Sequence, residues 1–180
     1  MRDVLVRNLM HRPDRGRILQ EFWIPLTDER ADVVEVNGRL VAFEIKSGSD
    51  DLSRLPRQLK AFAKVFEEII VVCDPRHTSE VLDSAQPWCG VVEAARTEKG
   101  ELQLSVVRHP QANPQPDPEL QLRLLWREEL IPEVRGLGFK PRLLRRPELQ
   151  EIILREYSAA QVSDLVRNRL RERDLSRRRW

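Results

Sequence analysis

The fold is decided by residues 30–46, which read RADVVEVNGRLVAFEIK. Two runs in this stretch, residues 31–36 and 40–46, are rich in β-branched and apolar residues, and Asn37-Gly38 lies between them. Asn-Gly between two such runs is the strongest short-range signal of a β-hairpin. The stretch therefore predicts two antiparallel strands joined by a short loop.

The length of that loop decides which side chains share a face of the hairpin. A two-residue turn at Asn37-Gly38 would turn Asp32 and Glu44 to opposite faces, because side chains alternate along a strand. A three-residue loop over residues 36–38 would place both carboxylates on one face, one diagonal step apart. Loops of three residues favour glycine in the left-handed conformation. We therefore predict the three-residue loop, with Gly38 at positive φ.

A helix and a buried strand are expected after the hairpin. The helix is predicted over residues 54–67, with Ser53 as its N-cap and Pro56 in its first turn. Its apolar residues have helical spacing, at Leu55, Leu59, Phe62 and Phe66. Residues 69–73 are wholly apolar, which is typical of a strand buried on both faces. Together with strand 40–46, these elements predict a βαβ unit with parallel strands.

The rest of the chain indicates an α/β core followed by a helical segment. In the core we also expect a helix over 2–10, a strand over 18–24, a helix over 77–86, and strands over 90–94 and 102–107. Four prolines lie in residues 109–118 and indicate a linker. Helices are expected near 118–135, 147–156 and 159–174, the last capped by Ser158. The predicted domains are a core over 1–108, a linker over 109–118 and a basic helical segment over 119–180.

Charge is distributed unevenly along a chain whose formal net charge is +2. Residues 1–119 hold 16 Lys and Arg against 20 Asp and Glu, whereas residues 120–180 hold 15 against 9. The basic end is either a solvated helix face or a surface that contacts phosphates. The chain has no apolar run of the ~20 residues that cross a bilayer and no secretory pattern at its start, so we expect no membrane partner and a place in the cytoplasm. The scattered cysteines and histidines predict no zinc site.

Three side chains in the hairpin point to chemistry. Asp32 lies in a strand that is apolar apart from Asp32 and Glu35, and Glu44 and Lys46 end the next strand on one face of it. Carboxylates on neighbouring strands can share Mg²⁺, which lowers the pKa of a bound water and offsets charge at phosphorus. A lysine beside them can orient that water. The residues also allow a plainer interpretation, in which Asp32 pairs with Arg30 or Arg39.

These residues resemble the PD-(D/E)XK nuclease superfamily, which has the restriction-endonuclease-like fold. The resemblance is carried by Arg30-Ala31-Asp32, by Glu44-Ile45-Lys46-Ser47 and by Gln58-x-x-x-Phe62. The chain is most similar to an uncharacterised bacterial family within it, in which Asn-Gly-x-Leu-x-x-x-Glu-Ile-Lys-Ser leads into Leu-x-Arg-Leu-Pro-x-Gln. Residues 37–47 and 52–58 follow that pattern here, and residues 124–130 look like that family's helical C-terminal part.

The resemblance implies a role for each matching residue. Asp32 and Glu44 would be ligands of Mg²⁺, for which Mn²⁺ can substitute, and Lys46 would be the catalytic lysine. Glu21 would match an upstream acidic residue, and Gln58 a glutamine on the following helix. Two positions depart from the commonest pattern: Ala31 replaces a proline, and Phe62 replaces a tyrosine, which removes a hydroxyl group.

The expected function is therefore that of a metal-dependent nuclease that hydrolyses phosphodiester bonds in nucleic acid, with DNA favoured as substrate. An alternative is a catalytically inactive module of the same fold that binds nucleic acid or protein, and another is an effector or immunity-type protein. Basic residues that either contact the nucleic acid or lie on solvated helix faces are Arg54, Arg57, Lys60, Arg167 and Arg171. The oligomeric state stays open, a homodimer included.

Overall fold

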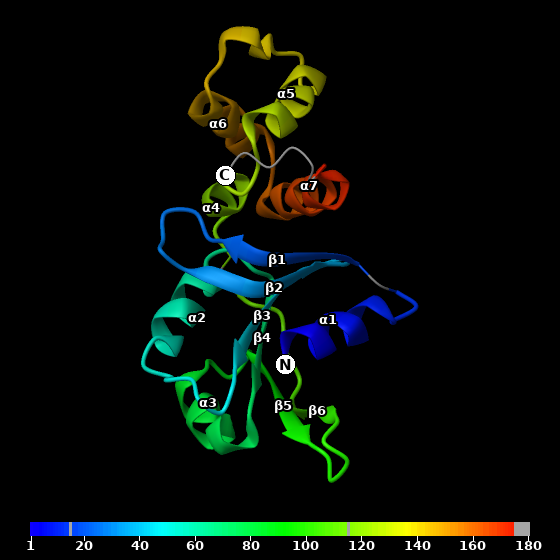
Figure 1. Ribbon diagram of the computed structural model, residues 1–180. Coiled ribbons are helices and arrows are strands. Elements are labelled where there is room, and N and C mark those ends of the chain that lie inside the picture. The colour runs from blue at the N-terminus through cyan, green and yellow to red at the C-terminus, as the bar shows by residue number, and fades with distance from the viewer. Residues whose placement is uncertain (15, 115, 175–180) are drawn as a thin grey trace. The chain divides into compact units, whose positions relative to one another are not determined.

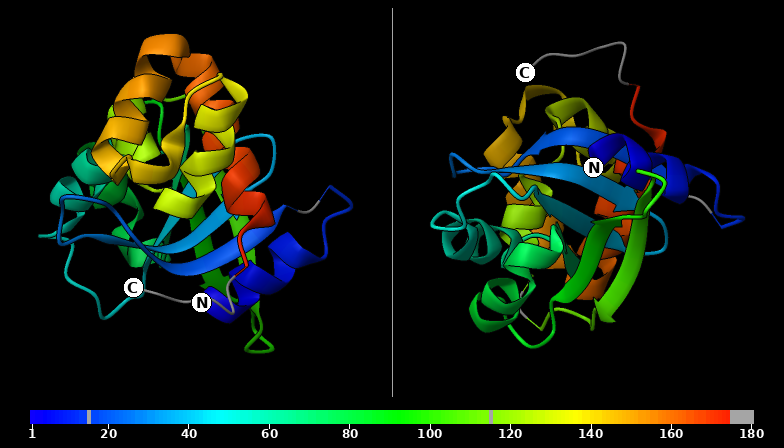
Figure 2. Two further views of the ribbon diagram at one scale, coloured as in Figure 1. Left: turned by 90° about the horizontal axis from the view of Figure 1, so that it is seen from above. Right: turned by 60° about the horizontal axis from the view of Figure 1, so that its bottom comes forward.

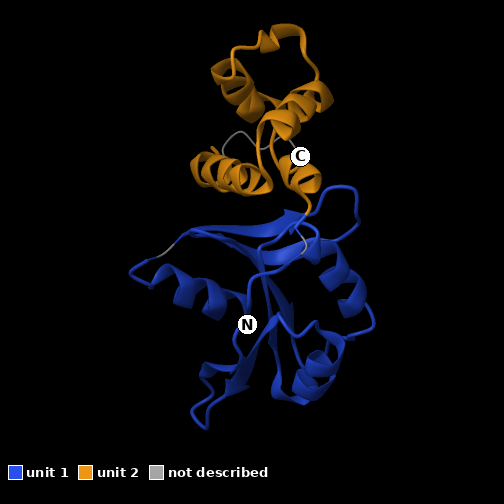
Figure 3. Ribbon diagram, turned by 180° about the vertical axis from the view of Figure 1, so that it is seen from behind, with its two compact units in different colours: residues 1–116 blue, residues 117–180 orange. Residues whose placement is uncertain are grey.

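The chain forms two compact units, Met1–Pro116 and Asp117–Trp180 (Figure 3). The computed structural model describes residues 1–14, 16–114 and 116–174. Unit 1 is an α/β unit with a mixed sheet of six strands flanked by helices, which confirms the predicted fold class. Unit 2 is helical throughout its described part.

The sheet of unit 1 follows the order of the sequence. Its strands are β1 (Arg17–Trp23), β2 (Arg30–Val36), β3 (Leu40–Lys46), β4 (Glu68–Cys73), β5 (Gly90–Arg96) and β6 (Leu102–Arg108). β3 pairs with β4, and β4 with β5, in parallel, and the other neighbours are antiparallel. The predicted βαβ unit is therefore confirmed, and β3 lies between a hairpin partner and a parallel strand.

Helices cover both faces of this sheet (Figures 1 and 2). α1 (Arg2–Met10) packs Leu5 and Leu9 on the face that carries Val33 and Phe43. The opposite face of the sheet is covered by α2 (Leu55–Ala63) and α3 (Thr78–Ser84), with the short η1 (Pro75–His77) directly before α3. Because neighbouring residues of β3 point to opposite faces, Glu44 is on the face opposite Phe43 and meets α2.

The hairpin loop has the predicted length but lies one residue further along the chain. Val36 pairs with Leu40, so the loop is residues 37–39, and Gly38 has φ +64° as predicted. The predicted loop over 36–38 is wrong because it would take Val36, which is fully buried, out of the ladder. With this register Asp32 and Glu44 still lie on one face of the hairpin. They are now directly opposite each other on the two strands, and not one diagonal step apart as predicted.

Helix α2 is shorter than predicted at both ends. Its N-cap is Arg54 and not Ser53, because the Ser53 hydroxyl donates to Asp51 Oδ2 at 2.6 Å. The helix ends at Ala63, where the amide of Asn113 donates to the Ala63 carbonyl at 2.6 Å and to the Phe66 carbonyl at 2.7 Å. The same bonds anchor Asn113, which lies in the predicted linker 109–118, to the core of unit 1.

Unit 2 consists of α4 (Pro118–Leu122), α5 (Arg127–Gly136), η2 (Pro141–Leu143), α6 (Arg146–Glu156) and α7 (Ala159–Glu172). The single helix predicted over 118–135 is divided, because Trp126 is extended and its backbone N–H donates to Glu129 Oε2 at 2.6 Å. Ser158 caps α7 as predicted, its hydroxyl accepting from the Gln161 N–H. The basic run 177–179 lies outside the described residues. None of the helices described in either unit has the length and apolar character to span a membrane.

Candidate functional site

The first three strands bring three carboxylates to one level of the sheet. The register of β1 and β2 pairs Gln20 with Val33, which puts Glu21 level with Asp32. The register of β2 and β3 puts Asp32 level with Glu44. Glu21 has φ +54°, so its backbone departs from the extended strand at this point. Three residues that are far apart in sequence are thus aligned across adjacent strands.

β2 and β3 separate at Asp32. The last backbone pair between them is Val33 with Phe43. Beyond it, Asp32 Oδ2 accepts a hydrogen bond from the Ile45 backbone N–H at 2.8 Å. The side chain replaces the missing bond of the ladder and is itself held in place. Asp32 is therefore a fixed carboxylate at the point where the two strands open.

Glu44 is held by two side chains that share one of its oxygens. Glu44 Oε1 lies 2.8 Å from Lys46 Nζ and accepts from Gln58 Nε2 at 2.6 Å. Lys46 Nζ also donates to Gln58 Oε1 at 2.8 Å, so the three groups form a closed triangle. All three are buried, with 3%, 7% and 7% of Glu44, Lys46 and Gln58 exposed. Glu44 Oε2 is buried as well and has no hydrogen-bond partner among the described residues.

Burial is the main influence on the ionisation of Glu44. Desolvation raises the pKa of the Glu44 carboxyl above its ordinary value, and the negative charge of Asp32 raises it further. The hydrogen bond and charge of Lys46 and the hydrogen bond of Gln58 act in the opposite direction. A positive charge placed between Asp32 and Glu44 would oppose both influences that raise the pKa.

Arg2, at the start of α1, already supplies positive charge to this site. Arg2 Nη2 donates to Asp32 Oδ1 at 2.8 Å, and Arg2 Nη1 forms an ion pair with Glu21. Asp32 therefore pairs with neither of the arginines considered from the sequence. Arg30 pairs with Glu21 at 2.5 Å and Arg39 with Glu68. No sequence signal identified Arg2, because a single basic residue at the start of a helix has no characteristic spacing.

The site opens into a cavity of about 550 Å³. Glu21 is not among the residues that line it, which are Arg2, Asp32, Glu44, Ile45, Lys46, Asp50, Asp51, Arg54 and Gln58. Asp50 Oδ2 accepts from the Ser47 hydroxyl at 2.7 Å, and this bond lowers the pKa of the Asp50 carboxyl. Asp51 accepts from Ser53. Both aspartates hold the turn that follows β3.

The donor set suits a hard cation of the Mg²⁺ type. Mg²⁺ is usually bound by one or two carboxylates together with water and phosphate oxygens. Asp32 and Glu44 supply two level carboxylates, and the unpartnered Glu44 Oε2 is a buried acceptor beside the cavity. Within the part of the chain that the structure describes, no group of three or more Asp, Glu, His or Cys side chains could hold a metal by itself. Metal binding here would therefore depend on water or substrate for the remaining ligands.

The predicted nucleic-acid contacts have varied surroundings. Arg54, the N-cap of α2, and Arg57 within the helix pair with the buried Glu29, at 3.4 and 2.6 Å, yet more than half of each side chain stays exposed. Lys60 is exposed on the same helix. Arg167 pairs with Asp164 on α7 and, like Arg171, belongs to unit 2. The structure brings Asp32, Glu44, Lys46 and Gln58 together, links Glu21 to Asp32 through Arg2, and places Arg54 at the rim of the cavity.

Comparisons with known proteins identify a family that the chain resembles over nearly its whole length. Residues 3–179 match the model of the family described as "Bacteriophage P4 protein cII". Protein cII of Enterobacteria phage P4 is 46% identical over 76 residues, which cover 42% of this chain and 29% of that protein. The chain thus matches less than a third of the length of this relative.

A solved structure gives a weaker likeness. The SPO1766 protein of unknown function from Silicibacter pomeroyi aligns with a TM-score of 0.44 and 17% identity, over 71% of this chain and 82% of that one. The family match covers nearly the whole chain and does not depend on this alignment. The chain therefore belongs to the bacteriophage P4 protein cII family.

Proposed function

We propose that this protein is a metal-dependent nuclease of the PD-(D/E)XK type, which hydrolyses phosphodiester bonds in nucleic acid, DNA in the first place. The observation that carries the proposal is the convergence of Asp32, Glu44, Lys46 and Gln58 on one cavity. These side chains come from two strands and a helix, and the short motifs in the sequence do not by themselves require them to meet.

Each side chain has a distinct part in the proposed reaction. Glu44 presents Oε2 to the cavity because Lys46 and Gln58 both bind Oε1. Asp32 is oriented by the Ile45 N–H, and its Oδ1 is free to exchange Arg2 for another cation. Magnesium bound by Asp32 and Glu44 would supply a water of lowered pKa and offset charge at the phosphorus.

Lys46 is suited to contact the reacting phosphate or the attacking water. An ammonium group has three N–H donors. Glu44 Oε1 and Gln58 Oε1 occupy two of them, so one is left for an oxygen in the cavity. Gln58 fixes the direction of this ammonium group and belongs to the site as a positioning residue.

The Arg2 bridge favours a second candidate, a nuclease-fold module that binds nucleic acid or protein without cleaving it. In that case the Arg2 guanidinium would neutralise Asp32 and Glu21 permanently, and no divalent cation would be needed. The two candidates differ in one property, since only the nuclease requires Asp32 to release Arg2. Metal binding and turnover therefore distinguish them.

A cleavage assay tests the proposal. The full chain is incubated with end-labelled single-stranded, duplex and flapped DNA and with RNA, in Mg²⁺ and in a chelator. We expect cleavage that requires Mg²⁺ and falls by about a hundredfold or more in Asp32→Asn, Glu44→Gln and Lys46→Met. Asp28→Asn, an exposed carboxylate in the β1–β2 connection, is the matched control and should cleave normally. Metal-dependent cleavage that persists in both Asp32→Asn and Lys46→Met would refute the assignment.

A further inference from the structure

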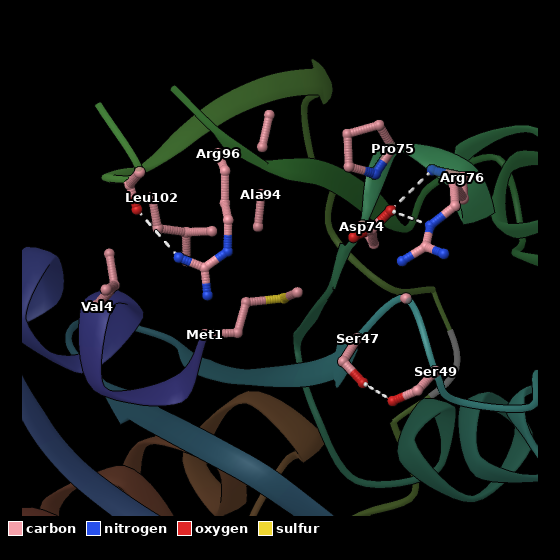
Figure 4. Close-up of a pocket in the computed structure, with 13 residues that line it drawn as sticks. Met1, Val4, Ser47, Ser49, Asp74, Pro75, Arg76, Ala94, Arg96 and Leu102 are labelled. Atoms are coloured by element: carbon pink, nitrogen blue, oxygen red, sulfur yellow. Dashed lines mark hydrogen bonds and ion pairs between the residues drawn. The ribbon is translucent and has the colours of Figure 1, made fainter. Parts of the chain in front are cut away.

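A second cavity lies at the ends of β3, β4 and β5 (Figure 4). Its volume is about 820 Å³. The two cavities share no lining residue, but at three places a residue that lines one is the chain neighbour of a residue that lines the other, the third being Ser49 beside Asp50. Ser47 lines this cavity and follows Lys46, and Met1 lines it and precedes Arg2. A strand of nucleic acid whose phosphate meets Lys46 would therefore have this cavity within its reach.

Two arginines supply the positive charge of this cavity. One terminal nitrogen of Arg96 donates to the Gly100 carbonyl at 3.0 Å, and the guanidinium lies between the side chains of Leu102 and Met1 (Figure 4). Arg76 Nε donates to Asp74 Oδ1 at 3.1 Å. The hydrogen bond from Arg76 lowers the pKa of the Asp74 carboxyl, so Asp74 is ionised at neutral pH. The side chains of Arg76, Arg96 and Asp74 together carry a net charge of +1, which favours an anionic ligand.

Gly48 allows Arg76 to take this position. A Cβ atom on Gly48 would lie 1.8 Å from Arg76 Nη2, so any larger residue would push the guanidinium away. Gly48 belongs to the turn that leaves β3 directly after Lys46. The turn after Lys46 therefore has room for the side chain of Arg76, which comes from the connection between β4 and β5.

Aliphatic side chains surround Arg96 in the wall of the cavity. Figure 4 shows the side chains of Met1, Val4, Ala94 and Leu102 on the side away from Asp74 and Arg76. A cavity that holds two guanidinium groups and a cluster of aliphatic side chains suits a ligand with anionic parts and a flat apolar part. A nucleotide within a strand has both parts, with one charge per phosphodiester.

We propose that this cavity binds one nucleotide of the substrate strand, next to the bond that is cut. Arg76 and Arg96 contact the phosphodiesters on either side of this nucleotide, and Met1, Val4 and Leu102 contact its base. The inference rests on the proposed function. It adds that the substrate is single-stranded at this position, because a base paired in a duplex could not enter the cavity.

The test measures binding without cleavage. Fluorescence anisotropy of a 5′-fluorescein deoxyribo-octanucleotide is recorded in EDTA for the wild type, Arg76→Gln, Arg96→Gln and Gly48→Ala, after circular dichroism has confirmed folding. We expect each variant to bind roughly tenfold more weakly, with the salt dependence of Arg76→Gln and Arg96→Gln reduced by about one phosphate contact. Lys99→Gln, an exposed lysine in the neighbouring turn, should bind like the wild type.

A second probe tests the base contact. An octanucleotide with one abasic residue at each successive position should bind the wild type more weakly at one position, and this difference should vanish in Leu102→Ser. Wild-type affinity in Arg76→Gln and Arg96→Gln, or no binding of any octanucleotide in EDTA, overturns the inference. Because no metal or turnover enters the measurement, a protein that binds in this way but never cleaves would contradict the proposed function alone.

Discussion

Gln58 Nε2 donates a hydrogen bond to Glu44 Oε1 at 2.6 Å, and this bond joins helix α2 to strand β3. The helix belongs to the crossover that makes β3 and β4 parallel, so the bond places part of the crossover in the site. It also determines which oxygen of Glu44 remains for a ligand, since Oε1 is the oxygen that Lys46 and Gln58 share. The same arrangement makes the stability of the fold and the chemistry of the site depend on each other.

Removing Lys46 should destabilise the protein as well as inactivate it. In Lys46→Met the buried Glu44 carboxylate loses its counter-charge, and breaking a buried pair in this way costs roughly 3 kcal/mol of unfolding free energy at neutral pH. Lys60→Met, on the exposed side of α2, should change that free energy by less than about 0.5 kcal/mol. Urea denaturation of both variants measures the difference, and equal stabilities would show that the Lys46–Glu44 pair is energetically unimportant.

The raised pKa of Glu44 has a defined sign in the pH dependence of stability. A folded-state pKa above the ordinary 4.5 means that the folded protein holds this proton more tightly than the unfolded chain. The resulting stabilisation is complete below pH 4.5 and is lost as the pH rises through the folded-state pKa. In a chelator, the unfolding free energy of the wild type relative to Glu44→Gln should therefore decrease over this range.

Glu35, whose pKa is also raised by burial, is present in both proteins of that comparison and cancels. Binding of Mn²⁺ should change in the opposite direction and strengthen as Glu44 loses its proton. A relative stability that rises with pH would show that the ion pair with Lys46, and not burial, dominates the ionisation of Glu44.

The hairpin illustrates how much of the fold the sequence predicts. Asn37-Gly38, the β-branched runs and the apolar run 69–73 were sufficient for the hairpin and the parallel crossover. The position of the loop was one residue wrong, because the turn signal does not reveal that Val36 is buried against the core. Helix ends were missed for a similar reason, since the amide of Asn113 that ends α2 comes from 47 residues further along the chain than Phe66.

Gly38 should matter for stability through its backbone alone. Its φ is +64° and a Cβ atom there would meet nothing within 4 Å, so Gly38→Ala introduces strain but no clash. We expect a loss of about 1 kcal/mol in unfolding free energy, and a smaller loss in Gly38→Asn, because asparagine tolerates the left-handed conformation better. Thermal unfolding of the two variants gives the comparison. Equal losses would mean that the loop changes conformation when glycine is replaced.

The sequence predicted the site in part. Asp32, Glu44 and Lys46 could be placed on one face because strand alternation and loop length are local properties. Gln58 came from resemblance, and its bond to Glu44 requires the packing of α2 on the sheet. Arg2 was not found at all, because its approach to Asp32 depends on how α1 lies on the finished sheet.

Arg2 should compete with a divalent cation for Asp32. In Arg2→Gln the guanidinium that pairs with Asp32 and Glu21 is gone, so a cation no longer has to displace it. We expect the Kd for Mn²⁺, measured by isothermal titration calorimetry, to fall about tenfold, which corresponds to about 1.4 kcal/mol. Arg7→Gln, an exposed arginine on the same helix, should leave the Kd unchanged. Unchanged or weaker binding in Arg2→Gln would support a permanent structural role for Arg2.

The account depends most directly on Asp32 and Glu44 sharing one divalent cation. Crystals of the full chain soaked in Mn²⁺ and measured at the manganese absorption edge locate such an ion by its anomalous scattering. The account predicts one peak within coordination distance of Glu44 Oε2 and the Asp32 carboxylate, with the Arg2 guanidinium displaced from Asp32. A Mn²⁺-saturated crystal with no peak there, and with Arg2 still bonded to Asp32, would contradict it.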